Sequence, residues 1–237
     1  MRIATFCFIF ALFSSVSFAQ SFDARSILEL EDVVVRVRRS CSYPNITNPV
    51  ASYFNAFFVG HKKNGNVVRE QLIGPGHGMG CDDAFNGALV SLDIFHRGET
   101  LRGGVAKKVL FTKDFIDPLD NALFEIDIPA SLVHKHIALA DINEYQVGDE
   151  VFLRAFFEPG NLRSDVFRYK SAFIEWKGKN SLRISTGVYP GMSGGLVFLK
   201  KKNKFYAIGP ISRFSFNDRF GFIDVSWVSI IPKDFLK

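Results

Sequence analysis

The sequence predicts an all-β protein that is built from two antiparallel, six-stranded β-barrels. Short segments rich in Val, Ile and Phe alternate with Gly, Asn, Asp and Pro, which is typical of strands separated by turns. No segment shows sustained helical periodicity. About twelve such strands in a chain of 237 residues fit a pair of barrels better than a single sandwich.

Six strands are expected in the first barrel, and each is a run of apolar, often β-branched or aromatic residues beside turn formers. They cover residues 32–37, 52–61, 66–73, 88–95, 106–111 and 122–127. The first contains consecutive valines and the second contains several phenylalanines, while the other four begin close to Gly or Asn. The Lys63-Asn64-Gly65 turn is expected to join the second and third strands as a hairpin.

Six further strands are expected in the second barrel for the same reasons. They cover residues 150–157, 167–176, 181–186, 195–199, 205–211 and 221–224. A lysine-rich turn at residues 200–204 indicates a second hairpin. Residues 129–148 are the least strand-like stretch near the middle, so they are expected to link an N-terminal lobe of residues 20–135 to a C-terminal lobe of residues 136–237.

The N-terminus reads as an export signal. Arg2 precedes an apolar stretch, and small residues at Ser17 and Ala19 suit cleavage before Gln20, so residues 1–19 would be removed. An uncleaved membrane anchor is the alternative, but the stretch is short for a hydrocarbon core of about 30 Å. We therefore expect a secreted or periplasmic protein with no stable membrane span after the signal is removed.

Charge and cysteine content follow from that expectation. The net charge of +5 falls to +4 with the loss of Arg2, and such a mild basic excess does not imply a nucleic-acid partner. Cys7 leaves with the signal, so Cys41 and Cys81 are expected to form one disulfide in an oxidising compartment. Closing that loop would stabilise the fold by about 3–4 kcal/mol on the chain-entropy model. Two unpaired thiols are the alternative.

The most informative motif is Gly191-Met192-Ser193-Gly194-Gly195, which stands directly before an apolar strand. A serine hydroxyl becomes a useful nucleophile when a base takes its proton and nearby N–H groups receive the oxyanion. Flanking glycines let the backbone turn sharply and point its amides into one small hole. A glycine-rich turn that merely enters a strand is the alternative for this pentapeptide.

The order of the histidines narrows the choice of catalytic arrangement. All five precede Ser193, which excludes the nucleophile elbow of α/β-hydrolases, where histidine follows serine. The order histidine, aspartate, serine is filled by His77, just after a strand, and by Asp120, just before one. His61 and His96 compete with His77, and Asp114, Asp117 and Asp127 compete with Asp120.

Three segments together resemble the chymotrypsin/trypsin-fold serine peptidases, including bacterial trypsin-like and HtrA-related enzymes. They are residues 72–79, 120–126 and 191–195. The resemblance implies an exported serine endopeptidase with its active site in the cleft between the barrels. His77 would be the base, Asp120 its partner and Ser193 the nucleophile that forms an acyl-enzyme. The amides of Gly191 and Ser193 would form the oxyanion hole. Protein or peptide substrates and no cofactor are then expected, and the oligomeric state stays open.

The resemblance also implies a substrate-binding set. Ser212 would support Asp120, and residues 212–214 would pair with the substrate backbone as an added strand. Gly187 stands where trypsins keep an aspartate, which disfavours cleavage after Lys or Arg. Arg213 lies in the same segment, and Phe214 would narrow the pocket toward small or medium apolar side chains.

Several features depart from the family pattern or leave other interpretations open. Met192 replaces the aspartate that pairs with a freed N-terminus in zymogen-activated enzymes, so maturation without that switch is expected. No PDZ-like segment is expected after the second barrel. His134 and His136 could share one strand face and bind a metal, but the sequence indicates no further ligands, so no metal site is expected. A catalytically impaired protease-fold binding module is the alternative function, and a structural β-protein or adhesin is a third.

Overall fold

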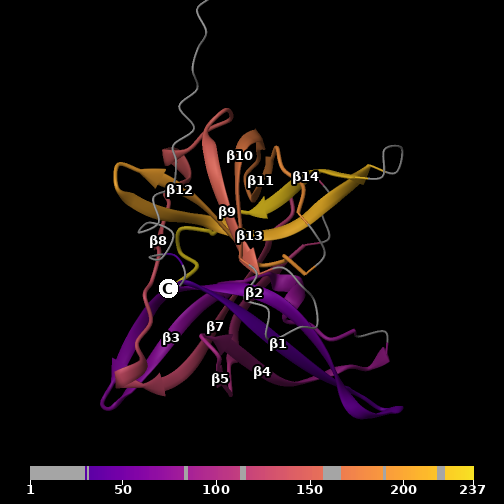
Figure 1. Ribbon diagram of the computed structural model, residues 1–237. Coiled ribbons are helices and arrows are strands. Elements are labelled where there is room, and N and C mark those ends of the chain that lie inside the picture. The colour runs from indigo at the N-terminus through magenta and orange to yellow at the C-terminus, as the bar shows by residue number, and fades with distance from the viewer. Residues whose placement is uncertain are drawn as a thin grey trace, which may run out of the picture.

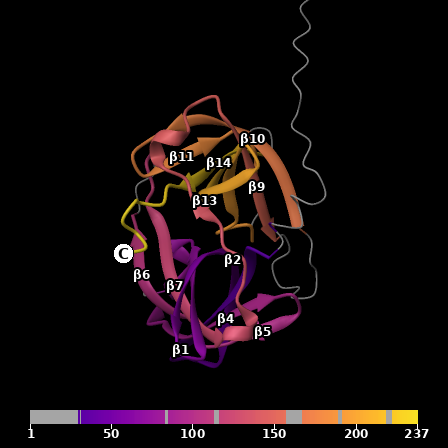
Figure 2. The same cartoon turned by 90° about the vertical axis from the view of Figure 1, so that its left-hand side faces the viewer.

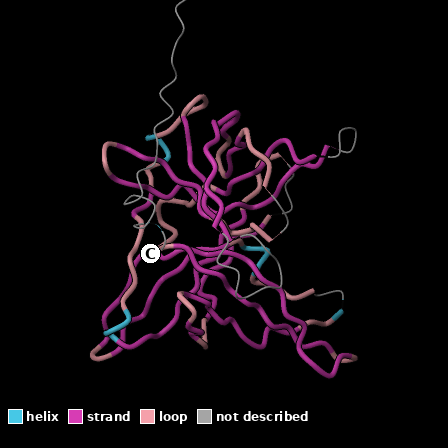
Figure 3. The backbone as a smooth tube through the Cα atoms, in the orientation of Figure 1, coloured by secondary structure: helices cyan, strands magenta, loops and turns pink. Residues whose placement is uncertain are grey.

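The computed structural model describes residues 30, 32–82, 85–112, 116–156, 167–188, 191–217 and 222–237. The side chains of residues 64, 167–169, 214–217 and 222–225 are not described. The expected export signal, residues 1–19, lies outside the described residues. Strands make up most of the described chain, and its helices are short (Figure 3). No helix in the described ranges combines the length and the apolar character that crossing a membrane requires.

The first lobe is an antiparallel sheet with the strand order β5-β4-β1-β2-β3-β7-β6. Its strands are β1 (Val34–Tyr43), β2 (Ile46–Asn64), β3 (Val67–Gly74), β4 (Ala88–His96), β5 (Glu99–Leu101), β6 (Val105–Phe111) and β7 (Asp120–Pro129). The amide of Gly104, just before β6, donates to the carbonyl of Leu92 in β4 at 3.0 Å, which links the two ends of the sheet. The sheet therefore curls into the lower lobe of Figure 1.

The second lobe contains a closed six-stranded barrel with a short extra strand. Its strands are β8 (Ala138–Leu139), β9 (Glu150–Phe156), β10 (Phe167–Lys177), β11 (Ser181–Ile184), β12 (Leu196–Lys201), β13 (Lys204–Asn217) and β14 (Phe222–Ser229). The order β12-β9-β10-β11-β14-β13 closes because β13 also pairs with β12. β8 pairs with β13 in parallel, unlike the barrel strands. The all-β, two-barrel fold predicted from the sequence is confirmed.

Every one of the expected strands overlaps an observed strand, and the differences concern strand length and the shortest strands. β2 begins at Ile46, well before its expected start, although it contains Pro49. Pro49 lies where the register with β1 shifts, between the pairs Tyr43↔Ile46 and Cys41↔Val50. Proline is tolerated at such an irregularity because no ladder hydrogen bond is lost. β5 and β8, only a few residues each, were not expected.

Three apolar clusters hold the lobes together. One lies within each sheet, and a third contains residues from both. In the third cluster, Phe57 and Ile73 of the first sheet pack with Phe152 and Phe198 of the second. Phe235 belongs to the same cluster, because the segment after β14 returns to the junction beside β6 (Figure 2). Side chains at the junction of the sheets are therefore held by a shared core.

The cysteine prediction is confirmed, because Cys41 and Cys81 form a disulfide with a Cα–Cα distance of 5.9 Å. Cys41 lies in β1, and Cys81 follows the short 3₁₀ helix η1 (Gly76–Gly78). Arg39 of β1 donates to the carbonyl of Gly78 at 3.3 Å and also to the carbonyl of Gly80. The disulfide and Arg39 together fix the loop that carries His77.

Candidate active site

His77 and Asp120 are joined by two hydrogen bonds. β3 and β7 pair through Gly74↔Ala122, and η1 follows β3, so the start of β7 lies beside His77. His77 Nδ1 lies 2.7 Å from Asp120 Oδ2, and the His77 backbone N–H donates to Oδ1 at 2.7 Å. One carboxylate therefore orients both the ring and the backbone of the same histidine, which is how an acid fixes a catalytic imidazole.

Gly76 is needed for this approach. A Cβ built on Gly76 would lie 2.7 Å from the carbonyl oxygen of Leu110 and 3.1 Å from Asp120 Oδ1. Any larger residue would push the loop away from the carboxylate. Close packing against Leu110 and Asp120 therefore explains why a glycine precedes His77 in this chain.

Asp120 is held from several directions at the junction of the sheets. It is 1% exposed, and the Ser212 hydroxyl of β13 donates to its Oδ2 at 2.6 Å. Its own amide donates to Ser229 Oγ at 2.8 Å, and the side chain of neighbouring Asn121 donates to the same oxygen at 2.9 Å. Residues of the second barrel therefore hold in place the Asp120 carboxylate and amide, which the first barrel supplies.

The Ser193 loop leaves two amides available. Gly191 and Gly194 have φ values of +89° and +79°, which favour glycine. The amide of Gly194 donates to the carbonyl of Ile211 at 2.8 Å, and that of Gly195 to the carbonyl of Met192 at 2.9 Å. Toward the rest of the described chain, the amides of Gly191 and Ser193 donate no hydrogen bond. Two unused donors around one serine can receive an oxyanion.

Asn55 is a functional candidate that sequence reasoning missed. It is 1% exposed in the middle of β2, and its backbone amide donates to the Ser193 carbonyl at 2.7 Å. Its side-chain Nδ2 donates to the carbonyls of Gly191 at 3.0 Å and Ser193 at 3.3 Å, and its Oδ1 accepts from the Phe156 amide at 2.7 Å. Asn is disfavoured inside strands, so an Asn between Phe54 and Ala56 was the available signal.

The contacts between Asn55 and the loop that carries Ser193 also place that loop against the loop that carries His77. A Cβ on Gly194 would lie 1.8 Å from the Asn55 carbonyl oxygen and 2.6 Å from Pro75 Cδ. Pro75 stands two residues before His77, so the two loops pack directly on each other. The hydrogen bonds of the described residues do not include one from the Ser193 hydroxyl to the His77 ring. Bonds between nucleophile and base are often looser without substrate.

Asn55→Ala is expected to lower kcat by about 100-fold, because a small displacement of oxyanion donors has an effect of that size. The variant loses the side-chain bonds to the Gly191 and Ser193 carbonyls and leaves the Phe156 amide without its partner, while the backbone amide of residue 55 keeps its bond to Ser193. The measurement is kcat per active site, titrated with an irreversible serine-directed inhibitor, together with thermal unfolding. A purely structural role would lower the titrated fraction and leave kcat per site unchanged.

The competing acids have other partners. Asp117 accepts from the amide of Asn180 at 3.0 Å and from the Ser181 hydroxyl at 2.9 Å, and Asp127 is paired with Arg69 at 2.7 Å. Asp114 lies outside the described residues. Asp120 is thus the acid among the described candidates that contacts a histidine with catalytic spacing.

The competing histidines lie in another part of the first lobe. His61, His134 and His136 lie around Glu70, and His96 lies against His134 with a ring-centroid distance of 4.5 Å. Burial, with a smaller contribution from the neighbouring His134, lowers the pKa of His96 to about 4. Because they lie around Glu70, away from the loop that carries His77, neither His61 nor His96 contacts Asp120 in the described chain.

The remaining expected site residues lie on β13 and before the serine loop. Arg213 pairs with Trp227 of β14, and its guanidinium lies 5.1 Å from that ring. The backbone of Phe214 pairs with Ser226, and its side chain is not described. The carbonyl of Gly187 accepts from Lys170 Nζ at 2.8 Å. Lys170 was not expected at this position, because it lies on β10, far from Gly187 in the sequence.

The comparisons with known proteins agree with the fold. No family model matches the sequence, and no curated protein matches it. Among solved structures, the chain is similar to the crystal structure of a thermostable serine protease, AL20, from an extremophilic microorganism. The two are 12% identical with a TM-score of 0.55, over 85% of this chain and 92% of that chain. At this identity the likeness shows the fold alone, a chymotrypsin-like arrangement of two β-barrels.

Proposed function

We propose that the protein is an exported serine endopeptidase with His77, Asp120 and Ser193 as its catalytic residues. The observation that carries the proposal is the double hydrogen bond between His77 and the buried Asp120. The packing of the Ser193 loop on Pro75 and the two available amides support it. The disulfide agrees with an oxidising compartment outside the cytoplasm.

The proposed reaction follows from these positions. The Ser193 oxygen attacks the carbonyl carbon of the scissile bond, and its proton passes to His77 Nε2 while Asp120 holds Nδ1. The amides of Gly191 and Ser193 donate to the oxyanion. Collapse of the tetrahedral intermediate breaks the C–N bond, and the leaving amine takes the proton from His77. A water molecule then attacks the acyl carbon while His77 takes its proton. The bond to the Ser193 oxygen breaks, Ser193 regains a proton from His77, and the carboxylic acid is released.

Residues 212–214 are proposed to hold the substrate backbone. Within the described ladders, Arg213 and Phe214 pair with β14, and the pairing of β13 with β12 ends before them, at Pro210, which makes this stretch a sheet edge. An extended peptide can add to such an edge through main-chain hydrogen bonds. The substrate would then lie beside Ser212, which contacts Asp120.

Cleavage after Lys or Arg is expected to be at least about 100-fold less efficient than after small or medium apolar residues, because an unpaired cation is costly to bury. Gly187 supplies no carboxylate, and Lys170 Nζ lies 2.8 Å from its carbonyl. The measurement is a cleavage profile on a peptide library. Lys170→Gln, which removes the charge and keeps a donor, should reduce the discrimination. A wild-type profile dominated by Lys or Arg would contradict the assignment.

Met192 supports maturation without a newly freed N-terminus. Its side chain is fully buried in the core cluster of the second barrel. An apolar residue there offers no carboxylate to a freed amine, so the loop conformation is proposed to depend on core packing. Apolar burial of this kind forms with the fold itself.

The proposal is tested by labelling with a fluorophosphonate probe. The wild-type protein should be labelled at one serine, and Ser193→Ala should not be labelled although its thermal unfolding is unchanged. Boiled protein is the control for nonspecific reaction. A folded wild-type protein that resists the probe and cleaves no peptide would instead support the catalytically impaired binding module.

A further inference from the structure

The fully buried carboxylate of Glu70 lies in the first lobe, on β3, the strand that precedes the His77 loop. Glu70 is 0% exposed, and its Oε1 accepts the backbone N–H of His134 at 2.9 Å. Its Oε2 lies 2.6 Å from His136 Nε2. Burial alone would raise the pKa of Glu70, but the hydrogen bonds from His134 and His136 outweigh it and lower the pKa to about 2. Within the described ranges, no lysine or arginine forms an ion pair with this carboxylate.

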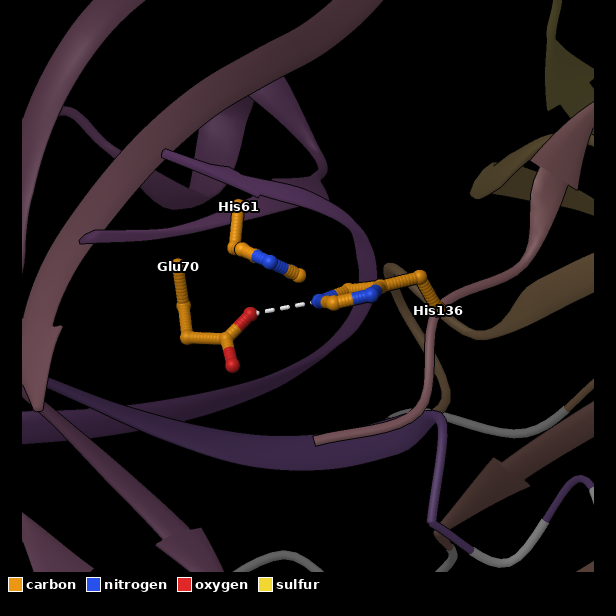
Figure 4. Close-up of side chains that lie close together, drawn as sticks. All are labelled: His61, Glu70 and His136. Atoms are coloured by element: carbon orange, nitrogen blue, oxygen red, sulfur yellow. Dashed lines mark hydrogen bonds and ion pairs between the residues drawn. The ribbon is translucent and has the colours of Figure 1, made fainter. Parts of the chain in front are cut away.

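His61 completes a cluster around that carboxylate. In the β2–β3 ladder His61 lies directly opposite Glu70, so both side chains are on the same face of the sheet. The His61 and His136 ring centroids are 4.8 Å apart. One ligand atom from each of His61, Glu70 and His136 lies within 4.8 Å of the others. Figure 4 shows the two rings converging beside the carboxylate.

We propose that His61, Glu70 and His136 bind a zinc ion. Two imidazoles and one carboxylate are a ligand set that zinc takes in proteins. Ligand atoms around four-coordinate zinc lie about 3–3.5 Å apart, as bond lengths of about 2.0–2.1 Å require. His61 is exposed and can rotate toward the other two ligands, which leaves the fourth position open to water.

The surroundings of Glu70 suit a metal ligand. The His134 amide holds Oε1, so Oε2 faces His136 and the proposed ion. Outer hydrogen bonds of this kind orient a ligating carboxylate. An ion pair between Glu70 and His136 is complete without a third residue, so it does not explain why His61 lies beside them. His61 makes a ring contact with His136 and no hydrogen bond to other described residues. A bound cation accounts for all three positions.

The proposed role of the ion is structural. The ligands come from β2, from β3 and from the segment that crosses from the first sheet to the second. That segment also docks through the Ile137 amide, which donates to the Phe58 carbonyl of β2 at 3.1 Å. Zinc would fasten the crossing segment to the first lobe. The sequence indicated no further ligands for His134 and His136, because His61 and Glu70 lie more than sixty residues earlier in the chain.

The experiment is a zinc titration of chelator-treated Ser193→Ala protein, a background that prevents self-cleavage. Calorimetry should show one zinc ion per chain, and saturating zinc should raise the unfolding temperature by several degrees. His61→Ala in the same background should weaken binding by about 100-fold or more, because loss of an outer partner alone costs 10–100-fold. Since the readouts are binding and unfolding, the result does not depend on peptidase activity.

Two controls make the result specific. Lys63→Ala alters another exposed residue of β2 and should bind zinc like its parent. His77→Ala removes the other accessible histidine outside the cluster and should also bind like its parent. Absence of binding by the parent, unchanged binding by His61→Ala, or loss of binding in His77→Ala would each overturn the proposal.

Discussion

His77→Ala is expected to lower kcat by about 10⁶-fold, the size of loss found when the histidine of a catalytic triad is removed. Without the imidazole, no group takes the proton from Ser193 as it attacks. The fold should survive because Asp120 keeps the backbone N–H of residue 77 and the Ser212 hydroxyl as partners. Steady-state cleavage of a peptide substrate and thermal unfolding are the measurements.

The double variant sharpens this prediction. If His77 and Ser193 act as one unit, His77→Ala combined with Ser193→Ala should be no slower than either single variant, since effects within a triad are not additive. Additive losses would mean that the two residues act in separate steps. A His77→Ala protein that keeps activity within about tenfold of wild type would refute the assignment of the base.

Asp120→Asn is expected to lower kcat by about 10⁴-fold, less than the loss of His77. An asparagine can still accept the His77 backbone N–H through one oxygen, so the loop should keep its place. Its amide group cannot accept from Nδ1–H at the second position, and the imidazole is then held in the wrong tautomer. The measurement is kcat on the substrate used for His77→Ala.

Asp127→Asn is the matched control for this prediction. Asp127 lies on the same strand, β7, but its side chain is exposed and pairs with Arg69 at the surface. An ion pair that is fully exposed to solvent contributes little to stability, so kcat and the unfolding temperature should change little. Equal losses in the two variants would mean that charge on β7, rather than contact with His77, is what matters.

Most of the strands could be predicted because their signals are local. Of the expected Lys63-Asn64-Gly65 turn, only Gly65 lies between β2 and β3, because β2 continues to Asn64. Of the lysine-rich turn, Lys202 and Asn203 lie between β12 and β13. The lengths were less predictable. β2 continues through Pro49 because β1 provides a partner with an irregular register there. Two-residue β8 forms only because β13 lies beside it.

The residues of the candidate site likewise include some that local sequence signals predict and others that they do not. The order of His77, Asp120 and Ser193 and the glycines around the serine are properties of the chain, and each residue lies next to a strand that the sequence predicts. Ser212 was expected only through a family resemblance, and its hydroxyl donates to Asp120 at 2.6 Å. Asn55 and Lys170 carried no local signal that linked them to residues 187–193.

By itself the sequence determined the all-β class, most strands, the pairing of Cys41 with Cys81 and the order of the catalytic candidates. These depend on side-chain type and on spacing over a few residues. Only the tertiary structure decided that Asn55 holds the Ser193 loop and that Glu70 gathers histidines from two distant segments. Such contacts depend on strand register and on how two sheets pack, and both are set by the burial of apolar surface across the whole molecule.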